Sequence, residues 1–368
     1  MTHASTPYRI ALCYGTRPQI IKASMLRRAM ARLGTVMAVD TGQHYDFALN
    51  ALLYSQLGVE PPDHYLEVGS GSHAEQTGTI LLRTEALLGA ARPDAVVVIG
   101  DTNSTLGSAL AAAKLRLPVV HVEAGLRAAD RYMPEEINRR VTDAVAGLLC
   151  APSADAAARL TQERPDARVR ETGDVARDVL IAQTERLPAP HTITPAAQGP
   201  YVYATLHRAE LTEQPCVLMA VLESLARLPV RTVLALHPRT RAALNRAGMG
   251  TPASETLSVI PAVGYLESLA LARGAAAVVT DSGGLQREAY WLGVPCITVR
   301  GETEWVETVA VGANLLLEPS CIPDRLQAAV LGAIEQPPAE WNRDAYGSGH
   351  AADAVVAALA SWLRELRG

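Results

Sequence analysis

The sequence predicts an α/β protein built from two doubly wound halves, each with a mainly parallel sheet. Three observations predict this class. Short apolar runs of strand length alternate along the chain with longer segments of helical periodicity, which is the pattern of strand–helix–strand units. The chain has 368 residues, 49% of them hydrophobic, and is therefore long enough for two domains. Residues 187–199 carry three prolines and little periodicity, which indicates a linker.

Ten strands are expected, and they divide evenly between the halves. Each is a short apolar run with a polar or glycine-containing segment after it. In order, they are 9–14, 36–39, 95–99, 119–122 and 148–150 in the first half, and 201–205, 232–235, 258–260, 275–279 and 296–299 in the second. We therefore expect an N-terminal Rossmann-like domain at 1–185 and a C-terminal one at 186–350. At 351–368 we expect a helix that packs back on the N-terminal domain, because its apolar residues have helical spacing.

The composition excludes several classes of function. With 33 basic and 38 acidic residues the net charge is −5, which argues against a nucleic-acid binder. No apolar run approaches the ~20 residues that span a bilayer, and the start of the chain lacks a signal peptide, so we expect a cytoplasmic protein. The cysteines are scattered, so we expect no disulfide, no metal site, and core thiols at Cys13, Cys150, Cys216, Cys296 and Cys321.

The turn Asp281-Ser282-Gly283-Gly284 is the strongest local sign of function. It lies between a predicted strand and a predicted helix at 285–292 that Gly293 ends, so its glycines fall at a helix N-terminus. Without side chains, the two glycines let an anion approach the backbone N–H groups, and the helix dipole favours a phosphate there. Taken alone, such a turn is more often purely structural.

In doubly wound sheets, ligands bind at the carboxyl ends of the strands, so the residues after each strand carry the most weight. Arg17 and Lys22 follow the first strand, where both side chains can face an anion. The alternative is a surface arginine and a lysine whose stem covers apolar surface. Asp101 follows the third strand, where it can act as an acid or simply cap the next helix.

The segment 118–127 runs from an apolar strand into a carboxylate, a glycine and an arginine. Burial of His121 and Glu123 in that setting costs free energy unless both are hydrogen-bonded. Pro134 then opens a helix on which Glu135 and Arg139 are spaced i,i+4, so they can face a cleft as a pair or form a solvated salt bridge. The apolar stripe expected to face the core is Ile137, Val141, Ala144, Val145 and Leu148.

The second half places cationic side chains after its strands. His207 and Arg208 follow the first of these strands, and His237 follows the next. An imidazole there can act as an acid or a base near neutral pH, and a hydrogen-bonded structural histidine is the alternative. The second half thus supplies an anion turn with positive charge around it, and the first half supplies carboxylates. This combination indicates a phosphorylated ligand that meets both.

Further short motifs of this kind occur in order along the chain. They are Gly15-Thr16-Arg17-Pro18, Thr41-Gly42-Gln43-His44, Gly100-Asp101-Thr102, the segment 121–127, Pro134-Glu135-Glu136 with Asn138-Arg139, Thr172-Gly173-Asp174, His207-Arg208 and the turn 281–284. Together they resemble the non-hydrolysing UDP-N-acetylglucosamine 2-epimerases. Within that family, the segments 22–24, 101–105, 131–136, 237–240 and 302–307 are most similar to the branch that acts on UDP-2,3-diacetamido-2,3-dideoxyglucuronate.

The resemblance implies a GT-B-like fold, with the active site in the cleft between a domain with catalytic acids and a UDP-binding domain. It implies inversion at C2 of a UDP-2-acetamido sugar, from gluco to manno, with no metal or cofactor. The C2 hydrogen is not acidic because no carbonyl is adjacent in the ring, so the family eliminates UDP to give a glycal and then adds it back. The resemblance further implies a cytoplasmic homodimer in polysaccharide biosynthesis, whose partners are the UDP-sugar and UDP, with no nucleic acid and no membrane.

The resemblance also implies roles for individual residues. By motif position, the catalytic residues are Asp101, Glu123, Glu135, His207, Lys22 and Arg139, and the substrate-binding residues are Arg17, Arg208, His237, Ser282, Gly283, Gly284 and Glu288. The three acids share the proton transfers, Arg139 orients a carboxylate, and Glu288 binds the ribose hydroxyls. The chain departs from the family pattern at Ala209, where many members have a second arginine, and at Gln19, where a glutamate is common.

Three other functions fit parts of the pattern. A hydrolysing epimerase uses the same elimination but releases UDP and free sugar. A GT-B glycosyltransferase shares the fold and the nucleotide turn but does not need three acids around C2. A non-catalytic sensor of nucleotide sugars does not need the acids at all. The sequence leaves the C3 and C6 substituents of the sugar open.

Overall fold

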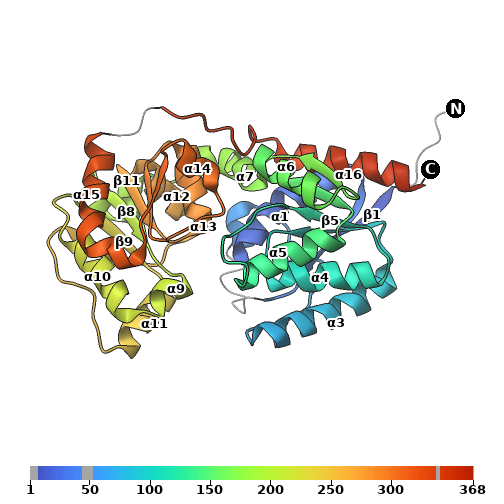
Figure 1. Ribbon diagram of the computed structural model, residues 1–368, viewed down its shortest axis with the longest axis horizontal. Helices are drawn as coiled ribbons and strands as arrows, with labels where there is room; N and C mark the ends of the chain where they lie inside the picture. The colour runs from blue at the N-terminus through green and yellow to red at the C-terminus, as the bar shows by residue number, and fades with distance from the viewer. Residues whose placement is uncertain (1–6, 44–52, 337–339, 368) are drawn as a thin grey trace. The chain divides into compact units, whose positions relative to one another are not determined.

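The computed structural model describes residues 7–43, 53–336 and 340–367. Their backbone divides into two compact units, each an α/β layer structure (Figure 1). Unit 1 contains the chain up to Ala182 and the chain from Asp344 onward, and unit 2 is Gln183–Arg343. His44, from one of the motifs above, lies outside the described residues.

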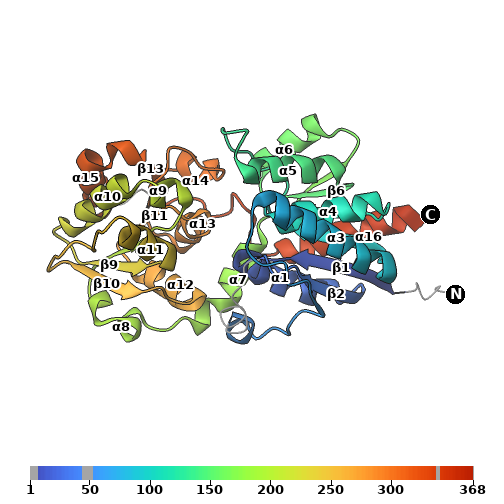
Figure 2. The same cartoon turned by 90° about the horizontal axis from the view of Figure 1, so that it is seen from below.

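Unit 1 has a parallel sheet with helices on both faces (Figures 1 and 2). Its strands are β1 (Tyr8–Tyr14), β2 (Gly34–Asp40), β3 (His64–Tyr65), β4 (Ala95–Ile99), β5 (Val119–Val122), β6 (Leu148–Ala151) and β7 (Arg168–Glu171), in the order β3-β2-β1-β4-β5-β6-β7. Its helices are α1 (Arg17–Met30), α3 (His73–Ala91), α4 (Asn103–Lys114), α5 (Pro134–Val145), α6 (Ala154–Glu163), α7 (Val175–Gln183) and α16 (Ala351–Arg367). Helices α3, α4 and α5 pack side by side, and α16 packs on α1 and β6.

Unit 2 repeats the same arrangement. Its parallel strands are β8 (Val202–Thr205), β9 (Thr232–Leu236), β10 (Leu257–Pro261), β11 (Ala277–Thr280), β12 (Cys296–Thr298) and β13 (Asn314–Leu316), in the order β10-β9-β8-β11-β12-β13. Its α-helices are α8 (Pro190–Ile193), α9 (Ala209–Thr212), α10 (Pro215–Ala226), α11 (Pro238–Arg246), α12 (Tyr265–Gly274), α13 (Gly283–Leu292), α14 (Val306–Ala310) and α15 (Ile322–Glu335). Short 3-10 turns are η1 (Thr184–Arg186), η2 (Pro195–Ala197) and η3 (Pro319–Cys321).

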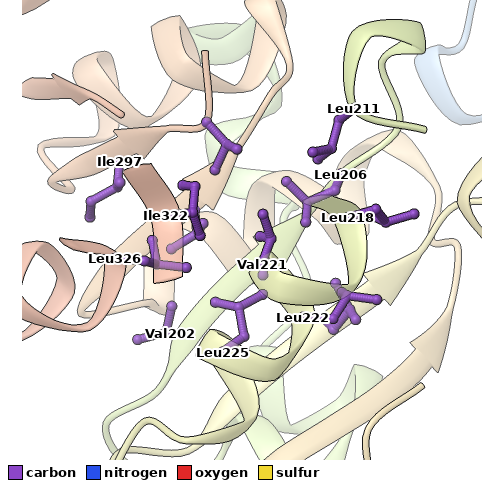
Figure 3. Close-up of a cluster of buried hydrophobic side chains, with 14 of the residues drawn as sticks. Val202, Leu206, Leu211, Leu218, Val221, Leu222, Leu225, Ile297, Ile322 and Leu326 are labelled. Atoms are coloured by element: carbon purple, nitrogen blue, oxygen red, sulfur yellow. The ribbon is translucent and has the colours of Figure 1, made fainter. Parts of the chain in front are cut away.

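The core of unit 2 lies between its sheet and the helices α10 and α15. Leu218, Val221, Leu222 and Leu225 recur at helical spacing on α10 and meet Ile322 and Leu326 of α15, as Figure 3 shows. Val202 and Ile297 contribute from the sheet. Burial of one such side chain stabilises the fold by about 1.5–3 kcal/mol. This packing holds the strands of unit 2, and with them the loops that follow the strands, in fixed positions.

All ten expected strands are present, with ends that differ by up to two residues, and the expected α/β class is confirmed. The strands β3, β7 and β13 were not expected. All three lie at sheet edges, where a strand needs no continuous apolar run because one side faces solvent. Strand β7, with the sequence Arg-Val-Arg-Glu, is an example.

The expected orientation of α5 is wrong. Its buried residues are Glu136, Asn138, Arg139, Thr142 and Asp143. From the apolar stripe, Ile137 is 46% exposed, Ala144 is exposed, Val141 and Val145 are half-buried, and Leu148 belongs to β6. The helix can bury its charged face because those charges are paired, as described below. Amphipathic periodicity located the helix but not the face that turns inward.

Two smaller expectations also need correction: that residues 187–199 form a linker, and that all of the cysteines are buried. The segment 187–199 contains α8 and η2, each with proline at its start, and its Ala197 packs in a core cluster with Tyr201. Cys13, Cys150 and Cys296 are buried, and burial raises the pKa of each thiol to about 12. Cys216 is exposed, and the side chain of Cys321 lies outside the described part.

None of the helices in the described ranges is long and apolar enough to cross a membrane.

Candidate active site

The strand order of both sheets defines where a ligand can bind. In unit 1, β1 lies between β2 and β4, and in unit 2, β8 lies between β9 and β11. The connections that leave β1 and β4, or β8 and β11, run to opposite faces of the sheet, and ligands bind at the carboxyl ends of the strands at such a point. The residues after these four strands are therefore the first candidates for a site.

The loop after β1 leads into α1 and presents Arg17 and Lys22. Thr16 is the N-cap residue, and Gln19 turns back so that its Oε1 accepts hydrogen bonds from the N–H groups of Gly15 and Thr16 at 2.9 and 3.1 Å. Arg17 is exposed at the first position of the helix. Lys22 is buried, and its Nζ contacts the carboxylate of Glu123. The alternative of a lysine that reaches solvent is therefore wrong.

Glu123 follows β5 in a backbone conformation that non-glycine residues rarely adopt, with φ of 71°. Such strain persists only where the surrounding structure holds it, and it is concentrated at functional sites. The N–H groups of Glu123 and Ala124 both donate to the carbonyl of Cys150 at 3.1 Å. The side chain is only 10% exposed. Glu123 is therefore a nearly buried acid that is fixed at a strand end and contacts a lysine.

Asp101 follows β4, and the next helix is capped by Thr102 instead. The Oγ1 of Thr102 accepts a hydrogen bond from the N–H of Thr105 at 3.4 Å. The simple capping role for Asp101 is therefore wrong. Its carboxylate accepts a hydrogen bond from Arg139 Nη2 at 2.5 Å, and the side chain is 30% exposed. Asp101 is thus an oriented acid that a ligand can reach.

Two adjacent acids at the start of α5 have different surroundings. Glu136 is fully buried, and its carboxylate lies 2.7–3.9 Å from guanidinium nitrogens of Arg127, Arg139 and Arg140. It also accepts a hydrogen bond from the N–H of Ala128 at 2.9 Å. Glu136 is therefore a structural acid that three cations hold in place. Glu135 is half-buried.

The supporting acid Asp143 was missed by the sequence interpretation. One of its oxygens lies 2.7 Å from His121 Nδ1, and the other accepts a hydrogen bond from Arg127 Nη1 at 2.7 Å. Burial alone raises the pKa of Asp143, but His121 and Arg127 outweigh burial, and the pKa is lowered. The sequence does contain a signal for Asp143, because the charged residues 136, 139 and 143 lie at helical spacing on one face of the helix. That polar face is the buried one.

In unit 2, the turn after β11 is braced by its own aspartate. The buried Asp281 carboxylate accepts hydrogen bonds from the backbone N–H groups of His207 and Arg208, each at 2.8 Å, which joins the loops after β8 and β11. Ser282 caps α13, and its Oγ accepts a hydrogen bond from the N–H of Leu285 at 3.3 Å. Gly283 and Gly284 are the first residues of that helix, so their N–H groups precede its hydrogen-bond ladder. These are the amides that bind an anion at a helix N-terminus.

Arg208 and His207 lie beside this turn, and His237 lies next to His207. A Cβ placed on Gly283 would lie 3.2 Å from Arg208 Nη2, so the guanidinium lies against the helix N-terminus. The rings of His207 and His237 have centroids 4.9 Å apart. His237 Nδ1 accepts a hydrogen bond from the N–H of Arg239 at 3.2 Å and caps α11. His237 therefore combines a structural contact with its place beside His207.

Glu288 lies on α13, four residues after Gly284 and on the same helix face. It is half-buried. Burial raises the pKa of the Tyr203 hydroxyl to about 12, and the negative charges of Glu288 and Glu267 add to that rise. Glu288 therefore lies near enough to Tyr203 of β8 for its charge to act on that hydroxyl.

The expected residues divide between the two units, and within unit 1 the structure brings Lys22 to Glu123 and Arg139 to Asp101. We call Arg17, Lys22, Asp101, Glu123, Glu135 and Arg139 the unit 1 set, and His207, Arg208, His237, Ser282, Gly283, Gly284 and Glu288 the unit 2 set. The unit 1 set can transfer protons, and the unit 2 set can hold a phosphate. Across residues 7–43, 53–336 and 340–367, no group of three or more His, Cys, Asp or Glu side chains is arranged to hold a metal ion.

Comparison with known proteins points to one family. A model of the UDP-N-acetylglucosamine 2-epimerase family matches residues 29–360. The UDP-2,3-diacetamido-2,3-dideoxy-D-glucuronate 2-epimerase of Pseudomonas aeruginosa is 42% identical over 317 residues, which cover 84% of this chain and 88% of that protein. A crystal structure of the Methanocaldococcus jannaschii UDP-GlcNAc 2-epimerase in complex with UDP-GlcNAc and UDP matches with a TM-score of 0.88 at 35% identity, covering 97% of this chain and 100% of that one.

A more distant structure bears on the fold alone. A calicheamicin glycosyltransferase is 17% identical, and its structure matches with a TM-score of 0.55 over 99% of this chain and all of that one. The likeness agrees with two Rossmann-like units of the GT-B type, as expected from the sequence.

Proposed function

The chain belongs to the UDP-N-acetylglucosamine 2-epimerase family, and we propose that it inverts C2 of a UDP-2-acetamido sugar from gluco to manno. The observation that carries the proposal is the pairing of Lys22 with Glu123 and of Arg139 with Asp101 at neighbouring strand ends. We propose UDP-2,3-diacetamido-2,3-dideoxyglucuronate as the substrate, because the relative of that name is 42% identical. UDP-GlcNAc is the second candidate, supported by the structure that contains it.

The reaction we propose starts with elimination of UDP. A carboxylate of the unit 1 set takes the C2 proton, the C1–C2 double bond forms, and the electron pair of the anomeric C–O bond leaves with UDP. UDP then adds back to C1 while an acid delivers a proton to the opposite face of C2. The UDP released in the first step is consumed in the second, so the net change is the configuration at C2.

We assign the proton transfers to Asp101, Glu123 and Glu135. General acid and base groups of this kind contribute roughly 10²- to 10⁴-fold to a rate. Lys22 and Arg139 fix the orientation of two of these carboxylates and supply counter-charge as the protons move. Arg17, exposed at the start of α1, is assigned to the diphosphate.

We assign UDP binding to the unit 2 set and treat unit 2 as the UDP-binding domain. The amides of Gly283 and Gly284 and the guanidinium of Arg208 hold the diphosphate, with His207 and His237 beside it. Glu288 accepts hydrogen bonds from the ribose hydroxyls. Because UDP is both leaving group and nucleophile, a site that retains it favours epimerisation over release.

We further propose that the protein acts in the cytoplasm as a homodimer, as the family resemblance implies, with no cofactor. Light scattering during size-exclusion chromatography tests the dimer. A mass of about 39.1 kDa, that of one chain, would contradict it.

The test is incubation of the purified protein in D2O with each UDP-sugar, followed by NMR. We expect deuterium at C2 and a gluco-to-manno change with the diacetamido-glucuronate. The same change only with UDP-GlcNAc would reassign the substrate and keep the reaction. Deuterium in neither sugar would refute the epimerase assignment.

The same experiment separates the alternatives. UDP that accumulates in step with turnover indicates a hydrolysing epimerase. Transfer of the sugar to an acceptor, with no deuterium in recovered donor, indicates a glycosyltransferase. Binding of the UDP-sugar without any turnover indicates a sensor.

A further inference from the structure

The turn that presents Asp101 is held by side chains from four elements, one of which is α4, where Thr105 Oγ1 donates a hydrogen bond to the carbonyl of Ile99 at 2.6 Å. Gln19 Nε2, from α1, donates a hydrogen bond to the carbonyl of Ile99 at 2.6 Å. His121 Nε2, from β5, lies 2.7 Å from the carbonyl of Gly100. Asn138 Nδ2, from α5, donates to the carbonyl of Asp101 at 2.9 Å. Three consecutive carbonyls thus each meet a buried side-chain donor.

These contacts satisfy backbone groups that the sheet cannot reach. Gly100 has φ of +66°, so the chain turns sharply out of β4 at this residue. Its N–H still donates to Val122 in the sheet at 2.9 Å, but its carbonyl points to His121 instead. An unsatisfied buried carbonyl costs about 1–3 kcal/mol. The side-chain donors therefore set where the turn, and with it Asp101, comes to rest.

His121 is a fixed donor because both of its ring nitrogens face acceptors. Nε2 faces the Gly100 carbonyl, which cannot donate, so Nε2 carries a proton. Nδ1 lies 2.7 Å from Asp143, which Arg127 also contacts. The ring is fully buried and cannot turn without loss of both contacts. Asp143 thus fixes His121, and His121 fixes Gly100.

Gln19 extends the same arrangement to the neighbouring loop. Its Oε1 accepts from the N–H groups of Gly15 and Thr16, while its Nε2 donates to Ile99. An amide can do both at once, whereas an ionised carboxylate only accepts. Gln19 therefore ties the loop that carries Arg17 to the turn that carries Asp101.

We propose that Gln19, His121 and Asn138 are positioning residues that fix the Asp101 carboxylate for proton transfer, with His121 at the centre. The proposal rests on the proposed function, because it assigns these residues to the step in which Asp101 takes part. A displacement of about 1 Å at a reacting group lowers a rate by roughly 10²-fold. Loss of the His121 contact is expected to act on the rate in this way, without a matching loss of substrate binding.

The sharpest test compares His121→Gln with His121→Asn. The longer amide places its nitrogen near the position of Nε2 and can still donate to Gly100. The shorter amide reaches only the position of Nδ1 and keeps the contact with Asp143 alone. We expect kcat to fall roughly 10²-fold in His121→Asn and much less in His121→Gln, with KM changed little in both.

Asp178→Asn is the matched control. The Asp178 carboxylate is also a buried tether in unit 1, and it accepts hydrogen bonds from the N–H groups of Ala351 and Ala352 at 3.0 and 2.7 Å. It holds the start of α16 and no part of the Asp101 turn. We expect Asp178→Asn to change the melting temperature and to leave kcat unchanged. A fall in kcat that only follows the melting temperature across all three variants would overturn the proposal.

A second measurement does not depend on activity. Hydrogen exchange of the amides at residues 100–102 reports how firmly the turn is held, and it is expected to speed up in His121→Asn but not in His121→Gln. If the wild-type protein epimerises neither UDP-sugar, the proposed function fails, and this exchange still tests the positioning. Equal exchange and equal kcat in the two His121 variants would refute the role of the Gly100 contact.

Discussion

The two sets of site residues use different kinds of chemical group. The unit 1 set consists of acidic and basic side chains, among which Lys22 contacts Glu123 and Arg139 contacts Asp101. The unit 2 set is organised around backbone N–H groups at the start of α13, with Asp281 bracing the turn from within. One depends on side-chain charge and the other mainly on main-chain geometry.

This difference fits the roles that we propose for the two sets. Proton transfer needs groups that change their charge, and only side chains can do so. The diphosphate gains one negative charge when the anomeric C–O bond breaks, and fixed amides and a helix dipole can stabilise that charge without rearrangement. Substitutions in the unit 1 set should therefore affect turnover and folding, whereas those at Arg208, Gly283 and Gly284 in the unit 2 set should mainly affect affinity for UDP.

The largest effect is expected for the acids themselves. Asp101→Asn and Glu123→Gln should each lower turnover by roughly 10²- to 10⁴-fold, because each removes a proton-transfer group. Affinity for UDP, measured by calorimetry, should stay near the wild-type value in both. Asp94→Asn is a control at the opposite end of β4, where Asp94 bonds to the N–H of Arg9 at 2.7 Å, and it should turn over normally. Wild-type turnover in either acid variant would remove that residue from the chemistry.

The second largest effect is expected for the loss of a buried cation. Lys22→Met removes the ammonium that contacts Glu123, and both side chains are at most 10% exposed. Breaking a buried ion pair costs about 3–5 kcal/mol in the free energy of unfolding. Arg32→Met is the matched control, because its pair with Asp353 is about 60% exposed and such pairs contribute below about 1 kcal/mol. Equal urea midpoints for Lys22→Met and Arg32→Met would contradict the expected difference between a buried and an exposed ion pair.

The third effect is a pH dependence of stability in unit 1. The pKa of Asp143 is lowered by His121 and Arg127 against the effect of burial, so its ionised form stabilises the folded state. That stabilisation is fully present above the unfolded pKa of ~3.9 and is lost as the pH falls through the lower pKa of the folded state. Asp143→Asn should be less stable than wild type at neutral pH, and the two urea midpoints should converge below about pH 4. A difference that stays constant down to pH 2 would contradict this assignment.

The two sets differ in how much of their structure could be predicted from the sequence. The turn 281–284 was identified because glycines between a strand and a helix have a local meaning, and α13 begins there as expected. The ten expected strands were found for the same reason, since an apolar run is a local signal. Main-chain features of this kind are visible within about ten residues of sequence.

The supporting charges of unit 1 could not be found in that way. Asp143 lies 22 residues after His121 and 16 after Arg127, and it meets them only in the folded structure. The apolar stripe of α5 favoured the wrong face, because periodicity does not reveal that Glu136 and Asp143 find partners elsewhere. Paired burial of charge depends on tertiary contacts, so sequence patterns underestimate it most at a site of this kind.

The smallest expected effect concerns Arg208 and tests whether affinity alone changes in unit 2. Arg208→Met removes a guanidinium that lies against the N-terminus of α13. A charge-assisted hydrogen bond contributes about 1.5–3 kcal/mol, so affinity for UDP should fall roughly tenfold or more. Turnover at saturating substrate should change less than affinity. The wild-type affinity should also fall more steeply with added salt than that of the variant, because one charge is missing there.

A pair of glycine substitutions sharpens this last prediction. The Cβ of Gly283→Ala would lie 3.2 Å from Arg208 Nη2, so the guanidinium has to shift, whereas that of Gly284→Ala meets only Ser282 Oγ at 3.8 Å. Both residues occupy the first turn of α13, so the change in helix propensity is shared. If Arg208 holds the diphosphate, Gly283→Ala should lose affinity for UDP in Arg208 protein and lose little more in Arg208→Met. An undiminished effect of Gly283→Ala in the Arg208→Met background would show that the added methyl acts on the amides and not through the arginine.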